Sequence, residues 1–134
     1  MSDLELYQEN VLDYYKHPRN KEILEGYTHT ARKLNPLCGD ELTIYLKIKN
    51  RVVERATFQG KGCAISQAAI SMLTEKIIGM SIESICHLGK EDILNLLGIP
   101  ITYTREKCAV LSLQVLQESL SEEKKNLKLG VEGC

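Results

Sequence analysis

The sequence lacks the features that mark several common functional classes. Its 17 Lys and Arg nearly balance 18 Asp and Glu, for a formal net charge of −1, so there is no general attraction to nucleic acid or anionic membranes. No apolar run approaches the roughly 20 residues that cross a bilayer. The acidic residues 1–5 lack the basic and apolar stretches of a signal peptide. We therefore expect a cytoplasmic protein that binds neither nucleic acid nor membrane.

Internal repeats, low-complexity tracts and linker-like stretches are also missing. A chain of 134 residues is long enough for one hydrophobic core and too short for two ordinary ones. We therefore expect a single domain over residues 1–134. Residues 121–134 mix charged and scattered apolar side chains, which is typical of a loosely held tail.

Cysteine, in contrast, is well represented, with five residues. Cellular thiols keep cytoplasmic cysteines reduced, and an odd number cannot all pair within one chain. The cysteines therefore argue against a disulfide framework and favour metal or sulfur chemistry. Cys86 falls on an apolar helical face and is expected to pack in the core. Cys134, at the end of the tail, has no stronger interpretation than a free thiol.

The middle of the chain has the pattern of an antiparallel sheet. Apolar and polar residues alternate over 41–49, strand formers fill 52–58, and Asn50-Arg51 between them suits a tight turn. We expect a hairpin here, with residues 27–33 as a third strand.

Helical patterns occur both before and after these strands in the sequence. The first begins at Leu4 and stops at His17-Pro18, because a residue before proline disfavours the helical region. Further helices are predicted after the hairpin, at 64–78, 81–88, 90–97 and 109–120. The order predicts an α+β fold, in which a small antiparallel sheet of about three strands is packed on one face by a helical half.

Three cysteines have surroundings that favour an ionised thiol. Cys63 and Cys108 directly precede predicted helices, so unpaired backbone N–H groups and the helix dipole stabilise a thiolate there. Cys38 is followed two residues later by Asp40, whose carboxylate could complete a set of four ligands. The three cysteines are too far apart in sequence for a local zinc knuckle. The fold itself would therefore have to assemble a metal site.

Each of these residues also has a simpler interpretation. An isolated intracellular cysteine is most often a small buried hydrophobic residue, and Asp40 beside a glycine suits the cap of a turn. Arg105 and Lys107 are cations that would stabilise a thiolate or persulfide at Cys108, although exposed cations are common. Residue pattern alone leaves these alternatives open.

Three motifs, in order, resemble the signatures of one family. They are LNPLCGD at 34–40, FQGKGCAIS at 58–66 and REKCAVL at 105–111. They are similar to those of the U-type iron–sulfur cluster assembly scaffold family, which includes IscU, SufU and the N-terminal domain of NifU. The resemblance covers nearly the whole chain.

This resemblance implies a protein that accepts sulfur from a cysteine desulfurase, binds zinc, iron or a transient [2Fe-2S] cluster, and passes iron–sulfur units to apo acceptor proteins. It implies that the metal ligands are Cys38, Asp40, Cys63 and Cys108. We interpret Cys108, with its neighbouring cations, as the persulfide acceptor.

The sequence departs from the IscU pattern at two places. Lys107 stands where IscU members carry a histidine, and 98–102 replaces a segment that a dedicated chaperone binds. These features resemble SufU, yet the chain lacks the insertion that SufU members carry between the second and third cysteines.

Three functions therefore remain open. The protein is a scaffold that builds clusters, a zinc-dependent sulfur shuttle or activator of a SufS-type desulfurase that builds none, or a structural zinc domain. Only the shuttle would have an enzymatic activity, that of a sulfurtransferase. A weak homo-oligomer also remains open.

Overall fold

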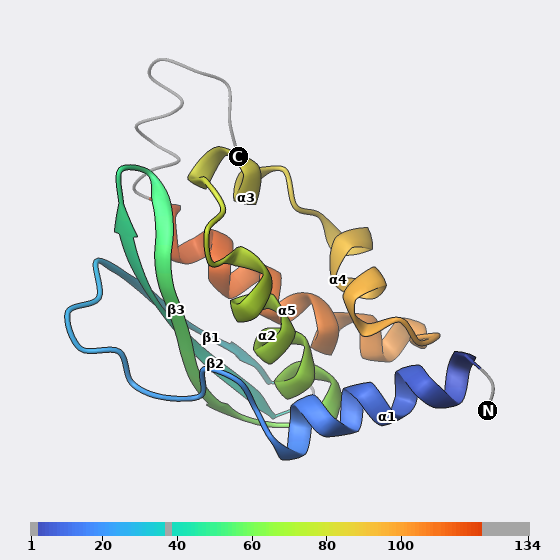
Figure 1. Ribbon diagram of the computed structural model, residues 1–134. Helices are drawn as coiled ribbons and strands as arrows, with labels where there is room; N and C mark the ends of the chain where they lie inside the picture. Colours follow the sequence, from blue (N-terminus) through green and yellow to red (C-terminus); the bar gives the residue numbers. More distant parts are fainter. Residues whose placement is uncertain (1–2, 37–38, 122–134) are drawn as a thin grey trace.

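The computed structural model describes residues 3–36 and 39–121. Within these residues, one helix precedes a three-stranded sheet and four helices follow it (Figure 1). The elements are α1 (Asp3–Lys16), β1 (His29–Asn35), β2 (Asp40–Lys49), β3 (Val52–Lys61), α2 (Ala64–Ile77), α3 (Ile82–Cys86), α4 (Lys90–Leu97) and α5 (Tyr103–Ser119).

The sheet is antiparallel, with strand order β1-β2-β3. Asn50 and Arg51 join β2 to β3 with φ angles of 54° and 62°, the positive values that a tight hairpin turn requires. The expected hairpin is therefore confirmed. The third strand is also present, but its pairing with β2 continues to Asn35, so that it begins and ends two residues later than expected.

Helices cover one face of this sheet, as Figure 1 shows for α2 and α5. α2 contacts β3, and α5 contacts β1 and β2, while α1 and α4 pack on α2. Leu42, Ile44 and Leu46 alternate along β2 and are fully buried in the same core as the helices. The predicted α+β arrangement is thus confirmed. That residues 1–134 form one domain stays a prediction, and residues 122–134 of the expected tail lie outside the described residues.

The last helix begins earlier than the sequence predicted. α4 ends at Leu97 and is capped by Gly98, which has a left-handed backbone (φ 69°), and Thr102 is the extended N-cap of α5. The Arg105 N–H donates to the Thr102 carbonyl at 2.9 Å, which closes the first turn of α5. Cys108 therefore lies in the second turn of this helix. The expectation that Cys108 directly precedes a helix is wrong.

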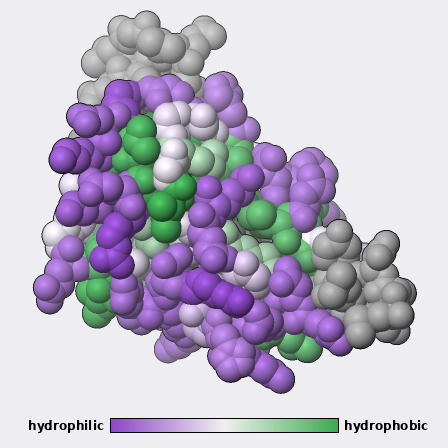
Figure 2. Space-filling model, in the orientation of Figure 1, coloured by the Kyte–Doolittle hydropathy of each residue, from purple (hydrophilic) through white to green (hydrophobic). Residues whose placement is uncertain are grey.

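The face of the molecule seen in Figure 2 is mainly hydrophilic, with apolar areas over α3 and α4. Ile78, which follows α2, is one exposed apolar residue of the chain, with 43% of its surface accessible. Among the described residues, no helix has the length and apolar character needed to cross a bilayer.

Candidate metal centre

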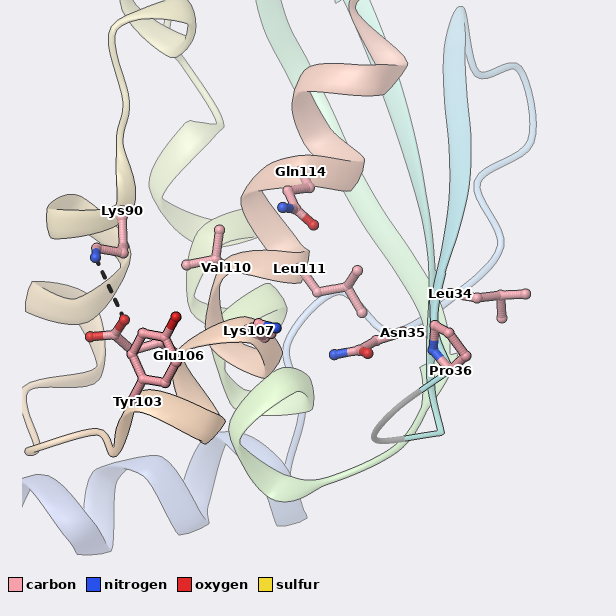
Figure 3. A pocket seen from close by; sticks show the side chains of 10 residues that line it. All are labelled: Leu34, Asn35, Pro36, Lys90, Tyr103, Glu106, Lys107, Val110, Leu111 and Gln114. Atoms are coloured by element: carbon pink, nitrogen blue, oxygen red, sulfur yellow. Dashed lines mark ion pairs between the residues drawn. The ribbon is translucent and has the colours of Figure 1, made fainter.

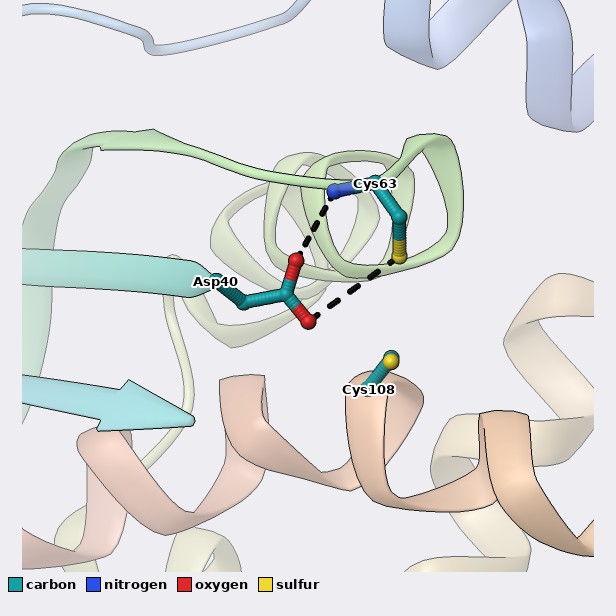
Figure 4. A group of neighbouring side chains, drawn as sticks. All are labelled: Asp40, Cys63 and Cys108. Carbon is teal, nitrogen blue, oxygen red and sulfur yellow. Dashed lines mark hydrogen bonds between the residues drawn. The ribbon is translucent and has the colours of Figure 1, made fainter. Parts of the chain in front are cut away.

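Asp40, Cys63 and Cys108 meet at one end of the sheet (Figure 4). One carboxylate oxygen and the two Sγ atoms all lie within 4.8 Å of one another. Asp40 and Cys108 are buried, and Cys63 is partly exposed. Of the four ligands that the sequence suggested, the structure thus brings these three together. Cys38 lies outside the described residues, so its place in the set stays a prediction.

The fold explains why residues so distant in sequence converge. Asp40 is the first residue of β2, and Glu41 pairs with Lys61 near the end of β3. Cys63 comes two residues after β3, so it lies at the same end of the hairpin as Asp40. α5 packs across β1 and β2 and carries Cys108 to this end.

Asp40 is held by hydrogen bonds to the start of α2. Its Oδ1 accepts the backbone N–H of Cys63 at 2.8 Å and the hydroxyl of Ser66 at 3.1 Å. Cys63 is the N-cap of α2, as the sequence predicted, but its own side chain makes no capping hydrogen bond. Asp40 therefore supplies an acceptor and a negative charge that a helix N-terminus favours. Its other oxygen, Oδ2, lies 4.0 Å from Cys63 Sγ.

Because Gly62 has no side chain, Asp40 can occupy the space beside it. A Cβ atom on Gly62 would lie 2.1 Å from Asp40 Oδ1 and 2.9 Å from Asp40 Cα, and its φ of +143° is rarely adopted by other residues. From the sequence, Gly62 is expected to allow a left-handed turn or a close approach of the backbone beside Cys63, whereas Ser66 is given no role. The only sequence signal for Ser66 is its place three residues after Cys63, one helical turn along α2.

Arg105 is the cation of the site. The negative charge of a Cys63 thiolate, followed by a hydrogen bond and charge at Cys108, raises the pKa of the Arg105 guanidinium above its ordinary value. This places Arg105 beside both sulfur atoms while it remains exposed. It therefore gives the site a positive charge that can stabilise thiolates and an added anionic sulfur.

Lys107, the other expected cation, lines a neighbouring cavity of about 400 Å³ (Figure 3). The cavity lies between the end of β1 and the first half of α5. Leu111 and Val110 contribute apolar surface, and Glu106 pairs with Lys90 at 3.5 Å along its edge. Asp40, Cys63 and Cys108 do not line this cavity.

Cys86 differs from the expectation made for it. It packs, partly buried, against the hydrophobic core as predicted, but its sulfur is disulfide-bonded. The expectation that the cysteines are all reduced is therefore wrong for this residue. Cys63 and Cys108, in contrast, form no disulfide.

The donor set fits zinc or iron. Bonds of about 2.0–2.3 Å in a tetrahedral zinc site put ligand atoms roughly 3.3–3.8 Å apart, so atoms that already lie within 4.8 Å of one another need only small movements. Two thiolates and a carboxylate are ligands that both zinc and iron accept.

The sequence of this chain matches one known family along most of its length. The family model of the NifU-like N terminal domain matches residues 6–128. The chain belongs to this family. Its fold agrees: it superposes with a TM-score of 0.72 on the crystal structure of a NifU-like N-terminal protein from Brucella abortus, at 18% identity over 92% of this chain and 96% of that one.

Relatives of both the SufU and the IscU type are similar to this chain. The zinc-dependent sulfurtransferase SufU of Bacillus subtilis is 36% identical, over 88% of this chain and 91% of that protein. The iron-sulfur cluster assembly scaffold protein IscU of Thermotoga maritima is 35% identical, over 87% and 94%. The crystal structure of FiSufU from Fervidobacterium islandicum has a TM-score of 0.71 and 26% identity, over 89% and 99%. The family is thus shown, and both functions are represented among the relatives.

Proposed function

We propose that this protein is a cytoplasmic iron–sulfur cluster assembly scaffold. It accepts persulfide sulfur from a cysteine desulfurase, binds zinc, iron or a [2Fe-2S] cluster through Cys38, Asp40, Cys63 and Cys108, and passes the cluster to apo acceptor proteins. The observation that carries the proposal is the convergence of Asp40, Cys63 and Cys108 within 4.8 Å at one end of the fold. The similarity to IscU of Thermotoga maritima supports the same function.

The mixed donor set suits a site that must release what it holds. Thiolates are soft ligands that bind zinc and iron–sulfur units tightly, whereas a carboxylate is a harder ligand. Asp40 is therefore the ligand of this set that leaves most readily. A site made only of thiolates would hold the same cargo more firmly.

Cys108 is the proposed acceptor of sulfur. Its Sγ, as a thiolate, attacks the outer sulfur of the desulfurase persulfide. A new S–S bond forms at Cys108 while the S–S bond of the partner breaks, and the partner's cysteine leaves as a thiolate. This exchange needs no external oxidant or reductant. The nearby guanidinium of Arg105 stabilises the anionic persulfide that results.

Burial sets a condition on this step, because Cys108 has no accessible surface. The incoming sulfur can reach it only after neighbouring side chains move. Arg105 is exposed and lies beside both sulfur atoms, so its displacement by a partner is the simplest way to open a path.

A second function has specific support. SufU of Bacillus subtilis, a zinc-dependent sulfurtransferase, is 36% identical to this chain, and Lys107 here occupies the position before the third cysteine. On this alternative, the protein holds zinc, shuttles sulfur for a SufS-type desulfurase and builds no cluster. It would then be an enzyme.

Anaerobic reconstitution separates the two functions. The protein is incubated with ferrous iron, cysteine and a cysteine desulfurase, and cluster formation is followed by visible absorption beside a zinc-loaded sample. The scaffold predicts absorption that grows in proportion to protein, is lost in Cys63→Ser and is kept in Cys86→Ser, which lies outside the site. Stimulation of the desulfurase without any cluster absorption would contradict the scaffold and support the shuttle.

A further inference from the structure

We propose that Ser66 is a positioning residue that sets which oxygen of Asp40 faces the metal. The inference rests on the proposed metal centre and concerns a residue that does not itself bind the metal. Its hydroxyl holds Asp40 Oδ1 and thereby directs Oδ2 toward the sulfur atoms.

The geometry around Asp40 separates its two oxygens. Oδ1 is engaged by two donors, the Cys63 N–H at 2.8 Å and the Ser66 hydroxyl at 3.1 Å. Oδ2 lies 4.0 Å from Cys63 Sγ, and in Figure 4 it is the oxygen on the side of Cys108. Ser66 and Asp40 are almost fully buried, so water does not compete strongly for these hydrogen bonds. Only Oδ2 is left to ligate.

The Ser66 hydroxyl has a choice of acceptors, since it also lies 3.1 Å from the Cys63 carbonyl oxygen. It carries a single proton, and a hydrogen bond to an ionised acceptor is roughly twice as strong as one between neutral groups. The carboxylate of Asp40 is therefore the preferred acceptor. Donation to the carbonyl would leave the hydroxyl oxygen facing a carboxylate without a proton between them.

Two donors on Oδ1 restrict the carboxylate. Rotation of the group, or binding of a metal through both oxygens, would break hydrogen bonds inside a buried site and leave buried polar groups unpaired, which is unfavourable. Asp40 is thus held in one orientation with one oxygen toward the thiols. Ser66 Oγ also lies 3.8 Å from Cys63 Sγ, so a variant of Ser66 must be compared with and without Asp40 to isolate the effect of this orientation on metal affinity.

A purely structural role for Ser66 is the main alternative, and Ser112 supplies a matched control. Ser112 is also fully buried, and its hydroxyl donates to the Ala109 carbonyl at 2.9 Å, the same local bond within a helix. Within the part of the chain that the structure describes, Ser112 makes no hydrogen bond to Asp40. Changing it to Ala removes a buried hydroxyl and leaves the metal centre untouched.

The test measures zinc affinity by competition with a chromogenic chelator, together with the visible spectrum of the cobalt-substituted protein. We expect Ser66→Ala to weaken zinc binding about 10- to 100-fold, the usual effect of removing a partner of a metal ligand, and to shift the cobalt bands. Ser112→Ala should change neither. Ser66→Thr keeps the hydroxyl, so it should bind zinc more tightly than Ser66→Ala.

A double-mutant cycle shows whether Ser66 acts through Asp40. In an Asp40→Ala background, adding Ser66→Ala should produce no further loss of affinity. A loss as large as in the wild-type background would overturn the inference, as would wild-type affinity in Ser66→Ala. These results leave the proposed metal centre intact, whereas a wild-type protein that binds no zinc would remove both.

Discussion

The backbone N–H of Cys63 donates a hydrogen bond to Asp40 Oδ1 at 2.8 Å, so two proposed ligands from separate elements are tied directly to each other. One residue begins β2 and the other caps α2. Their contact fixes the end of the hairpin against the start of the helix. Among the described residues, the fold itself thus brings the proposed ligands together, which reduces the ordering that metal binding would require.

A substitution at Gly62 tests this arrangement. Gly62→Ala places a Cβ atom 2.1 Å from Asp40 Oδ1 on a backbone with φ of +143°. We expect a loss of about 1–3 kcal/mol in the free energy of unfolding and weaker zinc binding, measured by denaturant titration and chelator competition. Gly89→Ala is the control, since a Cβ there meets no atom within 4 Å. Equal stability and affinity in both variants would show that Asp40 does not need the space.

Asp40→Ala should make a bound cluster longer-lived and slower to transfer, because the variant lacks the ligand that leaves most readily. The measurement is the rate of cluster transfer to an apo-ferredoxin. Asp40→Asn is a useful companion, since its amide oxygen can still accept from Cys63 and Ser66. Transfer by Asp40→Ala at the wild-type rate, or faster, would remove Asp40 from the release step.

Cys108→Ser should abolish persulfide labelling of the protein by a cysteine desulfurase and cysteine. The proposed reason is that a thiolate at this position receives the sulfur while Arg105 stabilises its charge. Mass spectrometry of digested protein locates the added sulfur, and Cys86→Ser and Cys134→Ser should still be labelled. Sulfur found mainly on Cys38, Cys63 or Cys134 would identify a different acceptor.

Removal of metal by a chelator should lower the melting temperature. A metal at 100 times its dissociation constant adds about 2.7 kcal/mol to the stability of the folded state, which corresponds to several degrees for a domain of this size. Differential scanning calorimetry before and after chelation measures the shift. Identical melting curves would show that β2, α2 and α5 are held together without the metal.

The sequence predicted the hairpin well because its signals are local. Alternation along β2 and a turn at Asn50-Arg51 determine both strands and their register. The start of α5 was missed for a different reason. Pro100 is the nearest helix-breaking residue before it, so the sequence shows where the preceding helix must end but not where α5 begins. The chain re-enters a helix at Thr102, and a pattern of apolar residues does not show where such a cap will form.

The metal centre was predicted only in part, for a similar reason. The motifs suggested Cys38, Asp40, Cys63 and Cys108 as ligands, and the structure brings the last three together, but spacing in the sequence does not reveal which groups hold them. The contact of Ser66 with Asp40 joins α2 to β2, and the clash that Gly62 avoids exists only in three dimensions. Such contacts depend on tertiary packing, which no local pattern encodes.

The most direct test of the account is the metal content of the protein and of one ligand variant. We predict one zinc per chain in the purified wild-type protein, retention of that zinc in Cys86→Ser, and its loss in Cys63→Ser. Circular dichroism confirms that each variant is folded. A folded Cys63→Ser protein that still holds one zinc per chain would contradict the proposed metal centre.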